Sequence, residues 1–324
     1  MIRALAAAIA LGAALGASAQ PDEAREAQRR GAELRRQGDF YGALQEFDKV
    51  VRLAPEASLG WYNRGLAKRD LNDLRGALYD FSRALAIDPA FFNALYQRGR
   101  CLQALGDDAA AVEDYTRAAQ IPGQIHARFL AIFWRGDAFR RLGRLPEALA
   151  DYTQVLELRT DTTARRSRAW VRAYLGQWRE TYEDMARYLH DTEGKEPDAA
   201  YAAILGALAL RRLGQRDEAA KLLQRWEPRL DAKQWPAPVL EFLRGKLAED
   251  RLIASASGAG QKTEALAYAG VAALAGGGGE HGFRLLSRVL REGDPAYLEY
   301  DLAYYELRRA GRAAPADRKE RKTK

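Results

Sequence analysis

A period of 34 residues constrains this chain more than any other feature of its sequence. The segments "FYGALQEFDKVVRLAP" and "LRGALYDFSRALAIDP" end at Pro55 and Pro89, which are 34 residues apart. The same spacing links residues at other phases, among them Ala43 and Ala77, Phe47 and Phe81, and Gly31, Gly65 and Gly99. A fixed spacing of this length indicates one helical unit repeated along the chain, each unit burying its apolar face against its neighbours.

Each recurring residue type has a structural reason. We number the repeat positions from Ala24, so that position 8 and position 20 are small and position 24 is aromatic. The first four units carry Gly31, Gly65, Gly99 and Gly136 at position 8, Ala43, Ala77, Ala111 and Ala148 at position 20, and Phe47, Phe81, Tyr115 and Tyr152 at position 24. Small residues let two helices approach closely, and the ring fills the space between them. The turn between the helices is expected at Gly38, Asn72, Gly106 and Gly143, because Gly and Asn tolerate positive φ.

The period and these residues resemble the tetratricopeptide repeat (TPR) family. The resemblance implies an all-α protein, a right-handed TPR α-solenoid of helix hairpins with a C-terminal capping helix. The sequence pattern places that last helix at "AYLEYDLAYYELRR", with Asp294 as N-cap and Pro295 as its first residue.

The pattern divides the chain into five segments. The prolines Pro228, Pro236 and Pro238 interrupt the period, and the tail contains Pro315 and no large apolar residue. The predicted segments are a signal peptide (1–19), a TPR array of about six units of which the first four are clear (20–227), a connector with one helix (228–262), a last TPR-like hairpin with the capping helix (263–311) and a basic disordered tail (312–324).

The first residues have the features of a cleaved export signal. Arg3 precedes an apolar stretch that is too short to span a membrane, and Ala17-Ser18-Ala19 forms an A-x-A cleavage site. We expect a mature chain that starts near Gln20 in the periplasm; the alternative is an alanine-rich N-terminal helix. No other segment is long and apolar enough to predict a transmembrane span.

The chain is basic, and part of its positive charge is concentrated in the last residues. The net charge is +7, and the 13 residues from Arg312 to Lys324 contain six basic and two acidic residues. Export argues against nucleic acid as a partner. The tail is therefore interpreted either as a weak attachment to anionic envelope surfaces or as a solvated tail without a role.

No catalytic or metal-binding pattern is found. "GAGQKT" at 258–263 lacks the Gly-Lys-Thr run of a phosphate-binding loop, and the three histidines His126, His190 and His281 are far apart. Cys101, the only cysteine, falls in a first helix and is interpreted as a small buried apolar residue. We therefore expect a protein that is not an enzyme and that uses no cofactor or metal.

The TPR resemblance implies a binding surface instead, on the concave face formed by the first helices of successive repeats. The predicted partner-binding groove consists of Tyr62, Asn63, Arg69, Asn93, Tyr96, Gln97, Arg100, Phe133, Asp137 and Arg140, with Trp134 beside them. Aromatic and arginine side chains dominate the energetics of many interfaces. The alternative for Tyr62, Tyr96 and Phe133 is packing between neighbouring helices. Arg100 and Arg140 are expected to be exposed charges.

A narrower resemblance covers most of the mature chain, and its specific motif is the last stretch, about residues 263–309. A signal peptide, about four clear repeats, a connector, an isolated hairpin and a "YLEYDLAYYEL" helix are similar to NlpI-type periplasmic TPR proteins. The resemblance implies a non-catalytic envelope scaffold that binds other proteins, such as peptidoglycan hydrolases or a protease, and that can form a homodimer. The lipidated cysteine of that group is missing here. The alternative function is a component that binds a peptide or a peptidoglycan fragment directly.

Overall fold

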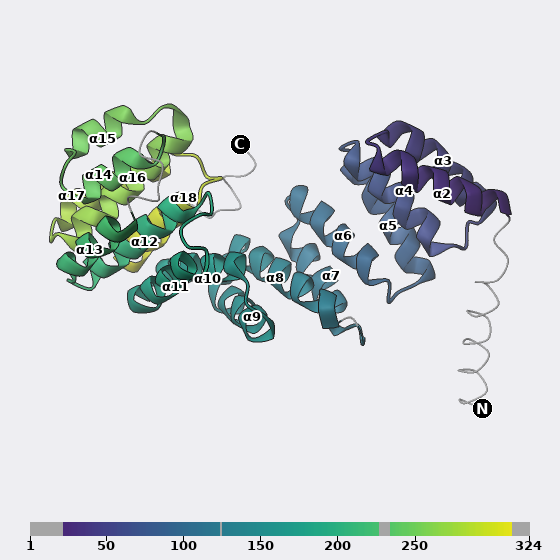
Figure 1. Cartoon of the computed structure of the whole chain (residues 1–324), viewed down its shortest axis with the longest axis horizontal. Helices are drawn as coiled ribbons and strands as arrows, with labels where there is room; N and C mark the ends of the chain where they lie inside the picture. Colours follow the sequence, from purple (N-terminus) through teal and green to yellow (C-terminus); the bar gives the residue numbers. More distant parts are fainter. Residues whose placement is uncertain (1–21, 124, 227–233, 313–324) are drawn as a thin grey trace. The chain divides into compact units, whose positions relative to one another are not determined.

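The computed structural model describes residues 22–123, 125–226 and 234–312. The predicted signal peptide and its cleavage site, the tail from residue 313 onward and the first residues of the connector lie outside this range. Every regular element in the described residues is a helix, from α2 to α18, and none is a strand (Figure 1).

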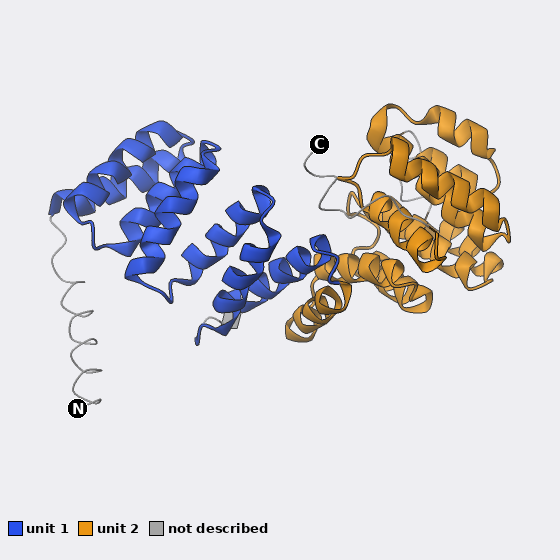
Figure 2. Cartoon of the chain, turned by 180° about the vertical axis from the view of Figure 1, so that it is seen from behind, with its two compact units in different colours: residues 1–144 blue, residues 145–324 orange. Residues whose placement is uncertain are grey.

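The chain divides into two compact units, residues 1–144 and 145–324 (Figure 2). Both units consist of antiparallel helix hairpins in which successive helices pack on each other. Unit 1 contains α2 (Asp22–Arg36), α3 (Phe40–Leu53), α4 (Ser58–Asp70), α5 (Leu74–Ile87), α6 (Phe92–Ala104), α7 (Asp108–Gln120) and α8 (Ile125–Arg141). Unit 2 contains α9 (Leu145–Leu158), α10 (Thr162–Tyr174), α11 (Trp178–Asp191), α12 (Ala199–Arg212), α13 (Arg216–Trp226), α14 (Ala237–Leu243), α15 (Glu249–Ser255), α16 (Gly258–Ala275), α17 (Gly279–Glu292) and α18 (Leu298–Arg309).

The recurring small and aromatic residues meet inside each hairpin. A methyl group placed on Gly65 would lie 2.8 Å from the ring of Phe81, and one on Gly99 would lie 2.7 Å from the ring of Tyr115. Both rings are fully buried. The glycine at position 8 is therefore required because the aromatic ring at position 24 occupies the space of its side chain.

The turns within the hairpins follow the same period. Asn72 adopts a φ of 64° and Gly106 a φ of 86°, a left-handed conformation that ends the first helix of the hairpin. An aspartate then begins the second helix, and its side chain accepts a hydrogen bond from a backbone N–H three residues on, which satisfies one of the unpaired donors at the helix start. Three hairpins of unit 1 share this cap, with Asp39, Asp73 and Asp107 accepting from Gly42, Gly76 and Ala110.

A buried ion pair joins the two helices of several hairpins. Arg98 on α6 donates two hydrogen bonds to Asp114 on α7, at 2.7 and 2.6 Å, and also donates to Ser82 of the preceding hairpin at 3.1 Å. Arg64 and Asp80 form the same pair one repeat earlier, and Arg168 and Asp184 form it in unit 2. One arginine thus connects its own hairpin to the preceding one, and its bidentate geometry favours one arrangement of the helices.

The C-terminal part of unit 2 differs from the sequence-based prediction in two respects. The described part of the connector holds two short helices, α14 and α15, because Gly245 at a φ of 74° ends α14. The last helix begins at Leu298 rather than directly after Pro295, because the Asp294 carboxylate accepts from the Ala296 N–H and forms a turn there. The helix α18 packs on α16 and α17, as a cap would, and also on α10 (Figure 1).

The predicted fold class is confirmed: the protein is an all-α solenoid of TPR-type helix hairpins. Cys101 is buried, as predicted, and burial raises the pKa of its thiol to about 11. The predicted segment boundaries at 227 and 262 stay predictions.

Candidate functional site

The residues of the predicted groove lie on α4, α6 and α8 of unit 1. Asn93 and Arg100, both on α6, are exposed. The other eight are half-buried: Tyr62, Asn63, Arg69, Tyr96, Gln97, Phe133, Asp137 and Arg140. We call the surface that these ten residues form the unit-1 face. Whether it binds a partner stays a prediction.

The tyrosines of this face pack on aromatic neighbours. The ring of Tyr62 lies 5.8 Å from that of Phe81 and 4.9 Å from that of Phe91. Tyr96 stacks on Phe92 of its own helix, and its ring lies 6.3 Å from that of Tyr115 on α7. These contacts match the packing alternative for both tyrosines, and the remaining exposed part of each ring still contributes to the surface.

Polar side chains connect the three helices of the unit-1 face. Arg69 on α4 donates to the amide oxygen of Gln97 on α6 and to Asp70. Gln103 on α6 donates to Asp137 on α8 at 3.2 Å. The bonds from Arg69 to Gln97 and from Gln103 to Asp137 each link the first helix of one repeat to that of the next. The unit-1 face is therefore held by its own polar network before any partner binds.

Arg140 does not match the expectation of an exposed charge. It donates to Asp137 at 2.7 Å, and its side chain is only 14% exposed. The i to i+3 spacing on α8 brings the two charges together and neutralises them locally. Arg140 thus belongs to the network that holds the face rather than to its accessible charges.

Arg100 is the accessible charge of the face. Its guanidinium lies 4.3 Å from the centre of the Trp134 ring, and it donates to the Tyr96 hydroxyl at 3.3 Å. No carboxylate among the residues that the structure describes forms an ion pair with it. The aromatic contact orients Arg100 and leaves its charge available to an anionic group.

In unit 2 the helix α18 contacts the surface of the first helices that corresponds to the unit-1 face. The ring of Tyr174 on α10 stacks on Tyr305 of α18 at 5.3 Å, and the Tyr174 hydroxyl donates to the Leu298 carbonyl oxygen at 3.1 Å. Arg212 on α12 pairs with Glu306 at 3.4 Å. Both Tyr174 and Arg212 are at position 13 of their repeats. The helix α18 therefore covers part of the first helices of unit 2.

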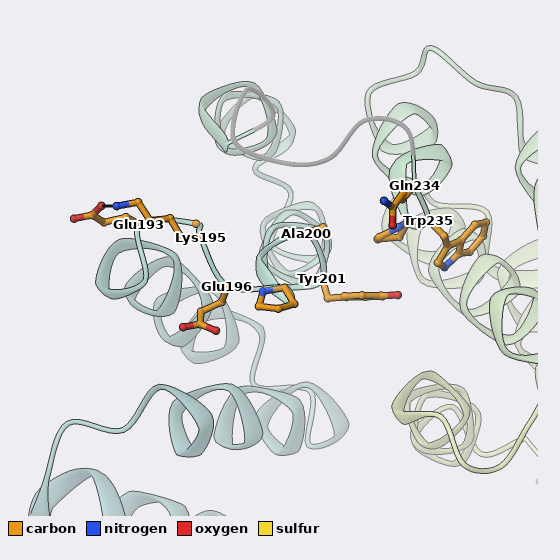
Figure 3. A pocket seen from close by; sticks show the side chains of 10 residues that line it. Glu193, Lys195, Glu196, Ala200, Tyr201, Gln234 and Trp235 are labelled. Carbon is orange, nitrogen blue, oxygen red and sulfur yellow. Dashed lines mark hydrogen bonds and ion pairs between the residues drawn. The ribbon is translucent and has the colours of Figure 1, made fainter.

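Unit 2 also contains a cavity of about 690 Å³ (Figure 3). It lies between the turn from α11 to α12 and the segment before α14, and the side chains of Tyr201 and Trp235 reach into it (Figure 3). Behind them the buried Glu264 of α16 accepts from the Trp235 indole N–H at 2.6 Å and from the Tyr201 hydroxyl at 3.5 Å. Burial raises the pKa of Glu264, and these two hydrogen bonds oppose the rise.

The histidines and acidic residues of the described part of the chain do not gather into a metal-type cluster. No group of three or more His, Cys, Asp or Glu residues there is arranged to hold a metal ion. His281 pairs with Glu249 on the surface, and His190 with Asp191. A helix long and apolar enough to cross a membrane is likewise not found among the described residues.

The sequence-based prediction missed Arg166, Trp170, Tyr201, Glu264 and Tyr268. They fall at positions 5, 9, 2, 2 and 6 of the later first helices, so the same repeat numbering could have found them. A second signal is the composition of α12 and α16, which are apolar on all sides. A helix of this kind needs a cover on both faces.

The comparisons with known proteins agree with the fold. The tetratricopeptide repeat family model matches residues 92–124, nearly all of the third repeat. No curated protein sequence matches the chain at a significant level.

Several solved structures are similar to this chain at low sequence identity. A tetratricopeptide repeat protein from Parabacteroides merdae has a TM-score of 0.53 at 16% identity and covers 89% of this chain and 100% of its own. PilF from Pseudomonas aeruginosa has a TM-score of 0.54 at 15% identity, covering 67% and 95%. YrrB, described as a TPR protein with an unusual peptide-binding site, has a TM-score of 0.51 at 20% identity, covering 62% and 98%. At these identities the likeness establishes the fold alone.

Proposed function

We propose that this protein is a non-catalytic scaffold that binds partner proteins or peptides through the unit-1 face. TPR folds generally serve protein–protein interaction, and the fold is that of a TPR protein. The observation that carries the proposal is the contrast between the two units. In unit 2, Tyr174 and Arg212 bond to residues of α18, whereas Asn93 and Arg100 of the unit-1 face are exposed.

The chemistry of the unit-1 face favours an extended or helical segment that carries an acidic group. Asn93 offers an exposed amide for backbone hydrogen bonds, and Arg100 offers a charge next to the aromatic Trp134. An arginine held against a ring loses little side-chain entropy when it pairs with a carboxylate, which makes it an effective anchor.

The test is the capture of partners from an envelope extract by purified protein. Arg100→Glu should abolish capture, because reversing a contact charge costs on the order of 2 kcal/mol of binding, roughly thirtyfold in affinity. The matched control is Arg52→Glu, an equally exposed arginine on α3, which should capture the same partners as the unchanged protein. Undiminished capture by Arg100→Glu would overturn the proposal.

The proposed location is the periplasm, with the signal peptide cleaved near Ala19-Gln20. The support is the n-region, apolar stretch and A-x-A site at the start of the sequence. The intact mass of the exported protein should correspond to a chain that begins at Gln20. A full-length mass that includes Met1, found in the cytoplasm, would refute it.

The more specific partners, a homodimer and the alternative function of direct ligand binding are also proposals. Peptidoglycan hydrolases or a protease as partners, and a homodimer, rest on the resemblance to NlpI-type proteins alone. Direct binding of a peptide or a peptidoglycan fragment has one supporting observation, the cavity at Tyr201 in unit 2. Titration of muropeptides against the purified protein tests it; binding that Tyr201→Ala removes would support this function.

A further inference from the structure

A second, smaller cavity lies between α10, α12 and the start of α18, all within unit 2. Its volume is about 290 Å³. It is lined by Arg166, Trp170, Asp198, Tyr201, Tyr297 and Glu299, together with Ala296 and Leu298. Drug-sized ligands occupy cavities of roughly 300–1,000 Å³. This cavity therefore fits a single side chain or a small molecule.

Aromatic side chains form much of the lining. Trp170 is almost fully buried, Tyr201 is half-buried, and Tyr297 is 37% exposed at the entrance. Three aromatic side chains thus line one small space. The face of an aromatic ring attracts a cation, most strongly where water is excluded.

The polar lining is acidic. Glu299 is only 4% exposed, and it accepts a hydrogen bond from the Tyr268 hydroxyl. The one basic residue of the lining, Arg166, already forms an ion pair with Asp198. No lysine or arginine among the described residues forms an ion pair with Glu299 or with its neighbour Glu264.

Two carboxylates buried together without a cation are energetically unfavourable when both are ionised. Burial first, and then the proximity of Glu264, raise the pKa of Glu299 to about 7. A cation bound next to Glu299 would relieve both effects. The titratable and charged groups around Glu299 are Arg166, Asp198, Tyr201, Glu264, Tyr268 and Asp301.

We propose that this cavity binds an alkylammonium group, as carried by a lysine side chain or by a small amine. The three aromatic rings contact the methylene chain and the cation, and Glu299 provides the countercharge. The site is separate from the unit-1 face, so it can exist whether or not that face binds a partner.

The experiment is a calorimetric titration of the purified full chain with Nα-acetyl-lysine methylamide. The matched neutral probe is Nα-acetyl-norleucine methylamide, which has nearly the same shape without the charge. We expect the lysine probe to bind and the norleucine probe to bind at least about tenfold more weakly, the size of one desolvated ionic contact. Titration with n-butylammonium separates a free amine from a lysine of a polypeptide: binding of the lysine probe assigns the site to a side chain, and binding of butylammonium alone assigns it to a small amine.

Three variants identify the site. Glu299→Gln should weaken the lysine probe about tenfold or more, and Tyr297→Ala, a change at a partly exposed residue that should not disturb folding, should also weaken it. The control Glu292→Gln, an exposed carboxylate on α17, should leave binding unchanged. Binding should also release protons near pH 7, seen as a dependence of the heat on the buffer, because the cation favours the ionised Glu299. Equal binding of the two probes, no binding of any amine, or full binding by both Glu299→Gln and Tyr297→Ala would overturn the proposal.

Discussion

The first helices of unit 1 and unit 2 carry the same repeat positions but differ in what lies on them. At position 9, Arg100 of α6 is exposed, whereas Trp170 of α10 and Leu208 of α12 are buried. The repeat position decides in which direction a side chain points. The polarity of the residue then decides whether that surface stays accessible or becomes part of the core.

The helix α12 packs on α14 and α16, and α10 packs on the helix α18. The helix α18 buries seven of its residues, including Tyr300, Leu302 and Leu307, against the hairpins of unit 2. Because α12 and α16 have no polar face, unit 2 without this helix would expose a large apolar surface. Unit 1 has polar first helices and needs no such cover.

The largest expected loss of stability comes from a substitution in the core of the repeat, which both units share. Phe81→Ala should lower the free energy of unfolding by about 3–5 kcal/mol, because it removes a fully buried ring that fills the space beside Gly65. Urea denaturation followed by circular dichroism measures it. The neighbouring Tyr79, 58% exposed, is the control, and its replacement by alanine should cost less than about 1 kcal/mol. Equal costs for the two variants would mean that the repeat register is misassigned.

The substitution Leu302→Ala tests whether α18 stabilises unit 2 by covering its apolar surface. Leu302 is a fully buried residue of α18, so we expect a loss of about 3 kcal/mol in the same denaturation experiment. Asn93→Ala on the unit-1 face should change stability by less than about 0.5 kcal/mol, because its side chain is exposed. If Leu302→Ala were as mild as Asn93→Ala, α18 would not be a structural cover.

A pH dependence distinguishes the buried interior of unit 2 from the exposed face of unit 1. The raised pKa of Glu299 means that the folded state holds its proton more tightly than the unfolded chain does. Its contribution is fully present below about pH 4.5 and is lost as the pH rises through about 7, a change on the order of 3 kcal/mol. Glu299→Gln should therefore flatten the stability profile between pH 5 and pH 8 relative to the unchanged protein. Parallel profiles for the two proteins would contradict this assignment.

The smallest effects separate the two arginines of the unit-1 face. Arg140→Glu should cost about 1 kcal/mol or more, because it breaks the pair with Asp137 and places two carboxylates together. Arg100→Glu should cost less than about 0.5 kcal/mol, since Arg100 is exposed. The difference between their unfolding midpoints in urea measures the difference in stability cost. A larger cost for Arg100→Glu than for Arg140→Glu would show that Arg140 is not part of the polar network.

Much of the fold could be predicted because the repeat encodes it locally. The pairing of Gly65 with Phe81 and the left-handed turn at Asn72 follow from residue size and backbone freedom, and the period places both. The site could be predicted only in part. The face position of Arg100 follows from the repeat, but the neutralisation of Arg140 by Asp137 depends on rotamers that spacing does not determine.

The return of α18 to α10 could not be predicted from the repeat. It is a contact between residues more than 120 positions apart, such as Tyr174 and Leu298, and no local pattern encodes it. The apolar faces of α12 and α16 indicated that some cover was needed, but not which segment would supply it.

The most direct test of the central claim is photo-crosslinking in an envelope extract with benzoylphenylalanine at single exposed positions. The residue at Asn93 lies on the unit-1 face, Arg52 lies on the second helix α3, and Tyr297 lies beside α18 in unit 2. The proposal predicts that the probe at position 93 crosslinks a partner protein, that the probe at position 52 does not, and that Arg100→Glu removes the crosslink at 93. Crosslinks to the same partner from position 52 or 297 but not from 93 would contradict it.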